Sequence, residues 1–390
     1  MSKKIFITLL SVTLLSSCTF LEEDLFDPSA ERTPIEITDN VNFADASLTQ
    51  ETQDLHTRLQ DLTQRGIMIG QQSAFGGRIE DFDFNAPIEE RFRITLNSDF
   101  ASVSNDLPAV IGVDFEAFTQ VNPDFPTESE LRRLNFLKNS IVEAHRNGII
   151  ITLSWHMTNP VTLGNAFDVS GQAVAQMLEQ GSVRDTFVTY LRNISVFFND
   201  LKDAQGNAIP VLFRPWHEMN GDFFYWGNGH RTAQQYKQLY QDTVRILTDD
   251  FGVHNLLYVY SPNWVSSREE YLENYPGDDY VDVLGVDVYD FRDRNFLNSA
   301  IDNLQIVEEI AKEKNMLFAL TETGLENVTK SNWWTERLYK AIRSSSASYA
   351  MLWRNGTFDH FYVPFEAHNS ADNFREFIAK DDILLNSDTE

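Results

Sequence analysis

Two glutamates in this sequence have surroundings suited to acid–base or nucleophilic chemistry. Glu218 follows the apolar run Val211–Phe213, which is typical of a strand buried on both faces, and it stands directly after His217. Glu322 follows a similar apolar run, Leu317–Leu320. Two carboxyl groups that work on opposite sides of one bond can hydrolyse a glycosidic linkage, one as the nucleophile and the other as the acid and then the base. We therefore predict that these glutamates form a catalytic pair.

The apolar runs that precede the two glutamates belong to a series of eight along the chain. The runs are Ile67–Gly70, Ala109–Val113, Ile149–Leu153, Val211–Phe213, Leu256–Tyr260, Val283–Val286, Leu317–Leu320 and Ala350–Leu352. Amphipathic stretches lie between most of them: two begin with the capping boxes Thr127–Glu130 and Thr232–Gln235, and others are expected at 182–201, 299–314, 333–344 and 371–380. Eight strands alternating with helices predict an α/β fold, a (β/α)₈ TIM barrel that forms one catalytic domain.

Polar and aromatic residues gather at the carboxyl end of every predicted strand, where a barrel of this kind carries its chemistry. These ends are Gln71–Gln72, Asp114–Glu116, Ser154–His156, His217–Glu218, Ser261–Trp264, Asp287–Asp290, Thr321–Gly324 and Trp353–Asn355. Glu218 on strand four and Glu322 on strand seven should face each other nearly across the barrel mouth. The structural alternative is a buried histidine–glutamate pair on strand four and, for Glu322, an ion pair with Arg354.

Four tryptophans, Trp155, Trp226, Trp264 and Trp353, lie at or just after predicted strand ends. Sugars present apolar C–H faces and a rim of hydroxyl groups, so a sugar-binding cleft needs flat aromatic floors with polar groups at their edges. Any one of these tryptophans could serve only to pack the core. The four together favour a sugar-binding cleft.

Three segments resemble the signature segments of glycoside hydrolase family 26, the β-mannanase family. They are Ser154-Trp-His-Met-Thr-Asn-Pro160, Arg214-Pro-Trp-His-Glu-Met-Asn-Gly221 and Thr321-Glu-Thr-Gly324, and the resemblance extends from about Asp54 to Ile378. It implies that Glu218 is the general acid/base, that Glu322 is the nucleophile, and that the configuration at the anomeric carbon is retained.

The same resemblance implies residues that hold the reacting sugar. His156 and His217 resemble the histidines that contact the sugar on the non-reducing side of the scissile bond. Trp353 resembles the tryptophan that forms the floor beneath that sugar. Tyr289 resembles the tyrosine that hydrogen-bonds the nucleophile.

Four further positions complete the predicted substrate-binding set. Arg354 and Asp287 resemble other sugar-contacting positions of the family. Phe223 stands where many members carry a tryptophan platform for the leaving-side sugar, so this chain departs from the family pattern there. Trp226 is included because it belongs to the aromatic cluster that follows strand four.

The beginning of the chain has the pattern of a bacterial secretory signal. Residues 1–17 combine a positive start, a short apolar region and small residues, and the sequence leading to Cys18 resembles a lipobox. We predict a signal peptide over 1–17, a lipidated Cys18, an acidic flexible tether over 18–46 and the catalytic domain over 47–385. Glu22–Asp24 resembles the acidic export signal of surface lipoproteins, which favours the cell surface over the periplasmic face of the outer membrane. The alternatives are an incidental cysteine and a merely solvated linker.

Charge and composition exclude several other classes. The formal net charge of −27 repels phosphate backbones and anionic headgroups, so we expect no nucleic-acid partner, and membrane contact only through the lipid anchor. Cys18 is the only cysteine, which excludes disulfides and thiolate metal sites. His-Glu-x-x-His and Gly-x-Ser-x-Gly motifs are missing, and 81–85 begins like a calcium loop but lacks its glycine. We expect a monomer that needs neither a metal nor a cofactor.

The resemblance and the glutamate pair lead to one functional hypothesis and two sets of alternatives. The hypothesis is an endo-β-1,4-mannanase that hydrolyses mannan, glucomannan or galactomannan. Within the family, the alternatives are an exo-acting enzyme that releases mannobiose, a mixed-linkage β-glucanase and a β-1,3-xylanase. Long loops after strand one (73–106), strand three (157–181) and strand four could wall off the cleft and favour exo action. Outside enzymes, the alternative is a non-catalytic glycan-binding lipoprotein.

Overall fold

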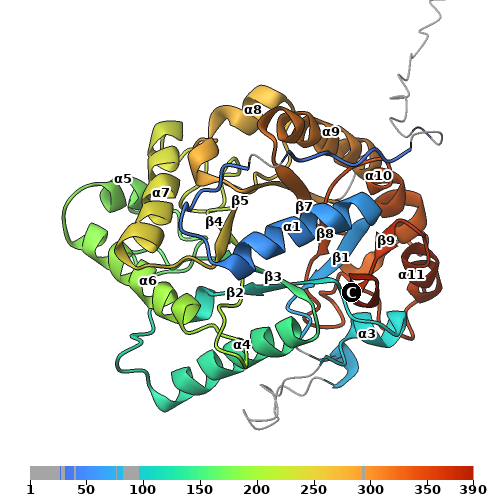
Figure 1. Ribbon diagram of the computed structural model, residues 1–390, viewed down its shortest axis with the longest axis horizontal. Coiled ribbons are helices and arrows are strands. Elements are labelled where there is room, and N and C mark those ends of the chain that lie inside the picture. Colours follow the sequence, from blue (N-terminus) through green and yellow to red (C-terminus); the bar gives the residue numbers. More distant parts are fainter. Residues whose placement is uncertain are drawn as a thin grey trace, which may run out of the picture.

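The structure is a computed structural model that describes residues 27, 31–38, 41–75, 77–81, 96–291 and 295–389. Within these residues, eight parallel strands pair in chain order and close when β8 pairs with β1 (Figure 1). The strands are β1 Ile67–Gln72, β2 Val110–Asp114, β3 Ile150–Trp155, β4 Val211–Pro215, β5 Leu256–Tyr260, β6 Val283–Tyr289, β7 Leu317–Gly324 and β8 Tyr349–Leu352. The predicted (β/α)₈ barrel is confirmed.

Helices cover the outside of the barrel, and both predicted capping boxes are formed. The main helices are α1 Gln50–Arg65, α3 Asp99–Ser104, α4 Glu128–Arg146, α5 Ala173–Leu178, α6 Ser182–Asn199, α7 Ala233–Arg245, α8 Arg268–Glu273, α9 Phe296–Lys314, α10 Lys340–Ile342 and α11 Ala371–Ile378. Thr127 and Thr232 cap α4 and α7 through their hydroxyl groups, as expected. The helix predicted over 333–344 differs: it is a π-helical turn, Trp334–Tyr339, that leads into the short α10.

Helix α1 closes the end of the barrel opposite the carboxyl ends of the strands. Leu55, Leu59 and Leu62 of α1 belong to one buried cluster with residues near the strand starts, among them Met68 and Leu257. Burying these apolar side chains seals this end against water. Chemistry that needs access to solvent is therefore confined to the other end of the barrel.

The segment before α1 is not a free tether in its described part. The Arg32 side chain donates to the backbone carbonyls of Gly66 and Ser345, and the Ala44 N–H donates to Asp282 at 2.8 Å. The Asp45 carboxylate lies 2.8 Å from the His254 ring. The prediction of a flexible tether through residue 46 is wrong for 31–38 and 41–46, because these residues find hydrogen-bond partners on the barrel that the sequence does not reveal. The signal peptide, Cys18 and Glu22–Asp24 lie outside the described residues.

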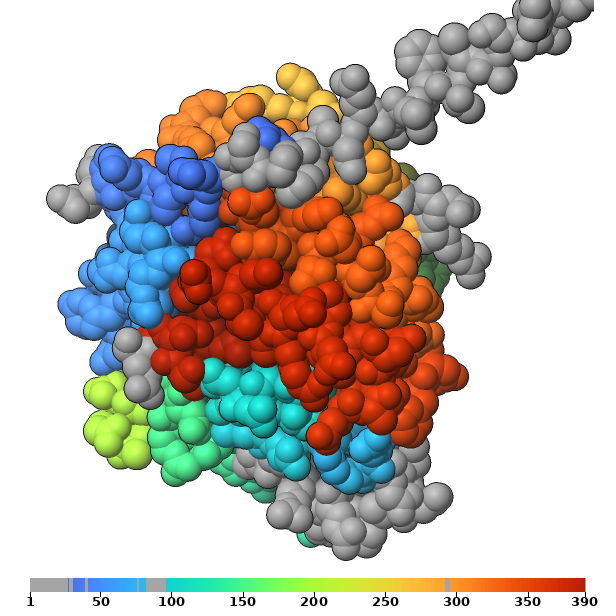
Figure 2. All heavy atoms as spheres, turned by 90° about the vertical axis from the view of Figure 1, so that its right-hand side faces the viewer, coloured from blue at the N-terminus to red at the C-terminus, as the bar shows by residue number. Residues whose placement is uncertain are grey.

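The C-terminal segment also belongs to the barrel, past the predicted boundary at residue 385. A two-residue strand, β9 (Ile383–Leu384), pairs with the start of β1, and the Arg58 guanidinium donates to the carbonyl of Thr389. Phe374 of α11 packs edge-on against Phe100 of α3, and Figure 2 shows the C-terminal segment beside the α3 region. No helix in the described ranges is both long and apolar enough to cross a membrane.

Candidate active site

Glu218 is presented by an unusual turn at the end of β4. After Pro215, Trp216 and Glu218 adopt φ values of 56° and 53°, in the left-handed region that non-glycine residues rarely occupy. The Glu218 N–H donates to the Ser261 carbonyl at 2.8 Å. The Trp216 indole, which is buried, donates to Thr243 at 2.9 Å. These bonds hold the turn and place the Glu218 side chain, which is half-buried, at the barrel mouth.

Glu322 is presented by irregular strand pairing around β7. The register between β6 and β7 shifts at Val286/Asp287, so that Asp287 stands opposite Glu322, and a second irregularity lies between β7 and β8. The Tyr289 hydroxyl donates to Oε2 of Glu322 at 2.7 Å, and the Arg214 guanidinium donates to Oε1. Each oxygen of the Glu322 carboxylate is thus held by a separate donor.

The two glutamates meet as the sequence predicts. One carboxylate oxygen each from Glu218, Asp287 and Glu322 lie within 4.8 Å of one another. Retaining glycosidases hold their two carboxyl groups about 5–5.5 Å apart, whereas inverting enzymes separate them by about 6.5–9.5 Å to admit a water. This close approach of single oxygens fits the shorter separation, that of a retaining site.

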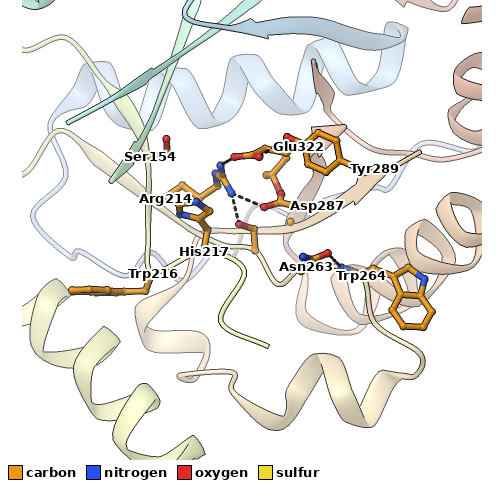
Figure 3. A network of polar contacts seen from close by, with 12 residues as sticks. Ser154, Arg214, Trp216, His217, Asn263, Trp264, Asp287, Tyr289 and Glu322 are labelled. Carbon is orange, nitrogen blue, oxygen red and sulfur yellow. Dashed lines mark hydrogen bonds and ion pairs between the residues drawn. The ribbon is translucent and has the colours of Figure 1, made fainter. Parts of the chain in front are cut away.

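Arg214 compensates the charge of this acidic cluster, and it was not among the site residues predicted from the sequence. It is 3% exposed and donates to Asp287 at 2.8 Å and to the Ser261 hydroxyl at 2.9 Å, in addition to Glu322 (Figure 3). The sequence signal that could have identified Arg214 is its place at the end of an apolar strand, because a buried guanidinium needs carboxylate partners. Arg354, which the structural alternative paired with Glu322, is exposed.

The surroundings of Glu218 favour its protonated form. Burial and then the Asp287 and Glu322 carboxylates raise the pKa of Glu218 well above its ordinary value, with Arg214 opposing. This upward shift of the pKa favours the protonated form of Glu218, which is the form that a general acid needs. The three carboxylates also have the residue types of a metal site, but the guanidinium of Arg214 already supplies the positive charge that lets them lie close together.

The two predicted sugar-contacting histidines lie side by side at the mouth. The ring centroids of His156 and His217 are 4.6 Å apart in an edge-to-face arrangement. His156 retains 15% of its side-chain exposure, and its Nδ1 lies 2.7 Å from the Asp114 carboxylate. His217 is 1% exposed, so its predicted direct contact with the sugar does not fit this burial, and it packs beside His156 instead.

Three of the remaining predicted contacts are open to solvent. Trp353 and Phe223 are half-buried, and Arg354 is exposed in the segment after β8. The Trp353 N–H donates to the Thr323 carbonyl at 3.1 Å, which ties this tryptophan to the strand that carries the nucleophile candidate. Phe223 packs against Phe224 with ring centroids 4.7 Å apart.

Two predicted sugar contacts are buried instead. Trp226 is fully buried: its indole donates to the His217 carbonyl at 2.8 Å and its ring stacks on Phe224. Asp287 is also fully buried, and it holds Arg214 and accepts a hydrogen bond from Thr321 at 2.6 Å. Neither prediction of a direct sugar contact fits this burial; both residues support the groups that face the cleft.

Only half of the four tryptophans predicted to line a cleft are accessible to a sugar. Trp155 is 1% exposed and donates to the Thr119 hydroxyl at 2.9 Å, so it packs the core as Trp226 does. Trp264 and Trp353 are half-buried. The Trp264 ring lies away from the cluster around Arg214 in Figure 3. Trp353 is thus the tryptophan of this group best placed to form a floor.

Known proteins resemble this chain along most of its length. The family model described as Glycosyl hydrolase family 26 matches residues 44–363. A mannan endo-1,4-β-mannosidase of Bifidobacterium adolescentis is 31% identical over 372 residues, which cover 89% of this chain and 36% of that protein. This chain thus spans about a third of that relative's length. A mannan endo-1,4-β-mannosidase of Bacillus subtilis is 27% identical, covering 85% of this chain and 83% of that protein.

Solved structures show the same likeness. The structure of a GH26 β-mannanase from Bacteroides ovatus aligns with a TM-score of 0.78 and 34% identity, covering 87% of this chain and 96% of that chain. An endo-β-1,4-mannanase from Cellulomonas fimi aligns with a TM-score of 0.79 and 30% identity, covering 89% of this chain and 78% of that chain. With a closed eight-strand barrel, a close glutamate pair at its mouth and a family match over most of its length, the chain belongs to glycosyl hydrolase family 26.

Proposed function

We propose that this chain is a retaining endo-β-1,4-mannanase that hydrolyses mannan, glucomannan or galactomannan. The pair formed by Glu218 and Glu322 carries the proposal. One carboxylate oxygen of each lies within 4.8 Å of the other, and their surroundings differ: the pKa of Glu218 is raised, whereas Glu322 accepts hydrogen bonds from Arg214 and Tyr289. The mannan endo-1,4-β-mannosidases that resemble most of this chain support mannan as the substrate.

In the first step, Glu322 attacks the anomeric carbon of the sugar on the non-reducing side of the bond. A covalent bond forms between this carboxylate and the sugar while the glycosidic bond breaks. The proton on Glu218 moves to the glycosidic oxygen, so the leaving sugar departs as a neutral alcohol. Arg214 and Tyr289 hold the nucleophile through one hydrogen bond to each oxygen, which fixes its orientation toward the carbon.

In the second step, Glu218 acts as a base. Having lost its proton, its carboxylate takes a proton from a water molecule that occupies the place of the departed sugar. The water oxygen attacks the anomeric carbon, the bond to Glu322 breaks, and both carboxyl groups return to their starting protonation states. Each step inverts the anomeric carbon, so the configuration is retained overall.

The sugar contacts follow from which side chains face the cleft. We place Trp353 and His156 around the sugar on the non-reducing side, with the buried His217 behind His156 and Arg354 farther out. Phe223 serves the leaving-side sugar. A half-buried phenylalanine ring offers a smaller apolar face than tryptophan, so its stacking on that sugar is weaker.

A stereochemical and product assay tests the proposed function. Proton NMR of a fresh mannan digest should show the β-anomer of the new reducing end first, with the α-anomer growing only by mutarotation. A time course on mannan, galactomannan, mixed-linkage β-glucan and β-1,3-xylan should show early manno-oligosaccharides of mixed length from the first two. An α-anomer at the first time point would contradict the retaining mechanism. If mannobiose were the sole early product, the enzyme would be exo-acting instead of endo-acting. If the β-glucan or the xylan were cleaved faster than mannan, the proposed substrate would be wrong.

Replacing Glu218 with alanine should affect substrates according to their leaving groups. With mannan, whose leaving alcohol needs a proton, kcat/KM should fall by about 10²–10⁴-fold, the contribution typical of a general acid. With an activated aryl mannobioside, the first step needs little protonation and should be nearly preserved. The comparison is made by measuring single-turnover rates on both substrates with the same Glu218→Ala preparation. Equal losses on the two substrates would be inconsistent with a general acid at this position.

We also propose that the enzyme is an outer-membrane lipoprotein exposed at the cell surface. The support is the sequence pattern of residues 1–17, Cys18 and Glu22–Asp24. Labelled palmitate should enter the protein in growing cells and should not enter a Cys18→Ala variant. Protease added to intact cells should digest the wild-type protein. Complete resistance to the added protease would assign the protein to the periplasmic face. Incorporation of labelled palmitate into the Cys18→Ala variant would show that Cys18 is not the lipidation site.

A further inference from the structure

Asp114, at the end of β2, is a carboxylate that the proposed mechanism does not use. Its Oδ2 accepts a hydrogen bond from the Ser154 hydroxyl at 2.7 Å and lies 2.7 Å from Nδ1 of His156. Its Oδ1 accepts the Glu116 N–H at 2.7 Å. Asp114 is therefore held from several sides while it faces a histidine of the cleft.

The ring of His156 lies between two phenylalanine rings. Phe167 lies nearly parallel to it with ring centroids 6.3 Å apart, and Phe224 meets it edge-to-face at 5.2 Å. Since the Asp114 carboxylate can only accept, the proton between the two residues belongs to Nδ1 of His156. In the described part of the chain, Nδ1 is the ring nitrogen of His156 that has a protein partner. Nε2 is left for a ligand in the cleft.

Nearby carboxylates favour the doubly protonated, positively charged form of the His156 ring. Burial of the ring opposes the charge, but Asp114, then Glu322 and Glu116, outweigh it and raise the pKa of His156 above its ordinary value. The same attraction, together with hydrogen bonds, lowers the pKa of Asp114 despite its burial. Both partners thus shift in the directions expected of an ion pair. The Arg354 guanidinium lowers the pKa of the neighbouring Glu116, against burial and the charge of Asp114, which raise it.

The neighbouring His217 has the opposite environment. Its pKa is lowered well below the ordinary value by burial first, and then by the guanidinium of Arg214 and the charge of His156. No hydrogen-bond partner reaches its buried Nδ1 within the described residues. Two imidazoles whose ring centroids lie 4.6 Å apart repel each other when both are charged. The carboxylate of Asp114 contacts His156, which favours the charge on that ring.

We propose that Asp114 is a positioning residue that makes His156 the charged member of this histidine pair and aims its Nε2–H at a hydroxyl group of the bound sugar. The sugar-binding part rests on the proposed function. The orientation and charge of His156 do not, because they exist without substrate. Asp114 touches no reacting atom and acts through His156 alone.

Nitrogen NMR of the histidine rings in the substrate-free enzyme tests the charge assignment directly. In ¹⁵N-histidine-labelled wild type, His156 should show the imidazolium pattern at pH 7, with both nitrogens protonated, while His217 stays neutral. In Asp114→Asn, the His156 titration should move to lower pH by about 1–3 units, the range that a close opposite charge produces. The control is Glu116→Gln, which removes an exposed carboxylate that makes no hydrogen bond to His156, and which should give a smaller shift.

Kinetics then separates this role from mere structural support. At pH 7, Asp114→Asn should lower kcat/KM on mannan by about 10–100-fold, the loss expected for a charge-assisted hydrogen bond. The ratio of variant to wild type should recover as the pH falls toward 5, since His156 then gains its proton without Asp114. A ratio that stays constant with pH, or an unchanged His156 titration, would overturn the proposal. A neutral His156 at pH 7 in the wild type would overturn it even if the variant fails to fold.

Discussion

Replacing Glu322 with alanine should abolish mannan hydrolysis, with kcat falling by about 10⁴-fold or more, or ~5.5 kcal/mol of transition-state stabilisation. The carboxylate that we propose to form the bond to the anomeric carbon would then be missing. Glu218 alone can protonate the leaving group but cannot attack. Single-turnover hydrolysis of an activated aryl mannobioside measures the loss. Added azide, small enough for the space left by the carboxylate, should restore turnover and give the α-mannosyl azide.

The matched control for this variant is Glu326→Ala. Glu326 lies just beyond β7, is exposed, and contacts His360 instead of the acidic cluster. Its loss should leave hydrolysis near the wild-type rate. A Glu322→Ala protein that still hydrolyses mannan, or a β-configured azide product, would show that another group is the nucleophile. Circular dichroism of both variants verifies that the fold survives.

Replacing Arg214 with methionine should lower the free energy of unfolding by about 3–5 kcal/mol at pH 7. The guanidinium is buried and donates to both Asp287 and Glu322, so the variant leaves two buried carboxyl groups without a compensating charge, although burial already raises the pKa of Asp287 to about 8. The loss should be smaller near pH 5, because protonation removes negative charge that the variant can no longer balance. Urea denaturation at both pH values measures it, and activity should fall with the misplaced nucleophile.

Arg192→Met is the control for a lost arginine at the surface. Arg192 pairs with Asp124 in solvent, where ion pairs contribute about 0–1 kcal/mol. Its variant should unfold almost as the wild type does at either pH. An Arg214→Met protein as stable as this control would mean that the acidic cluster does not depend on the guanidinium. Charge compensation by Arg214 would then no longer explain why the three carboxylates lie so close together.

The barrel, and the meeting of Glu218 and Glu322 at its mouth, could be predicted from the sequence alone. The apolar runs are short, buried on both faces and regularly separated by amphipathic stretches, and that pattern is a local property of the chain. Once the order of strands is known, the geometry of a closed parallel barrel brings the ends of strands four and seven to one mouth. Glu218 and Glu322, 104 positions apart in the numbering, are therefore paired by topology without any knowledge of their contacts.

Only the tertiary structure decided which polar and aromatic groups face the substrate. Irregular register beside Asp287 and left-handed turns at Trp216 and Glu218 redirect side chains in ways that simple strand alternation cannot foresee. Asp287 and Trp226 are buried supports, and Arg214 is the counter-charge of Asp287 and Glu322. The partners of these groups come from distant strands, as do those of the segment 31–46 that binds to the barrel. Burial and charge compensation depend on such long-range neighbours, so they are fixed only when the chain has folded.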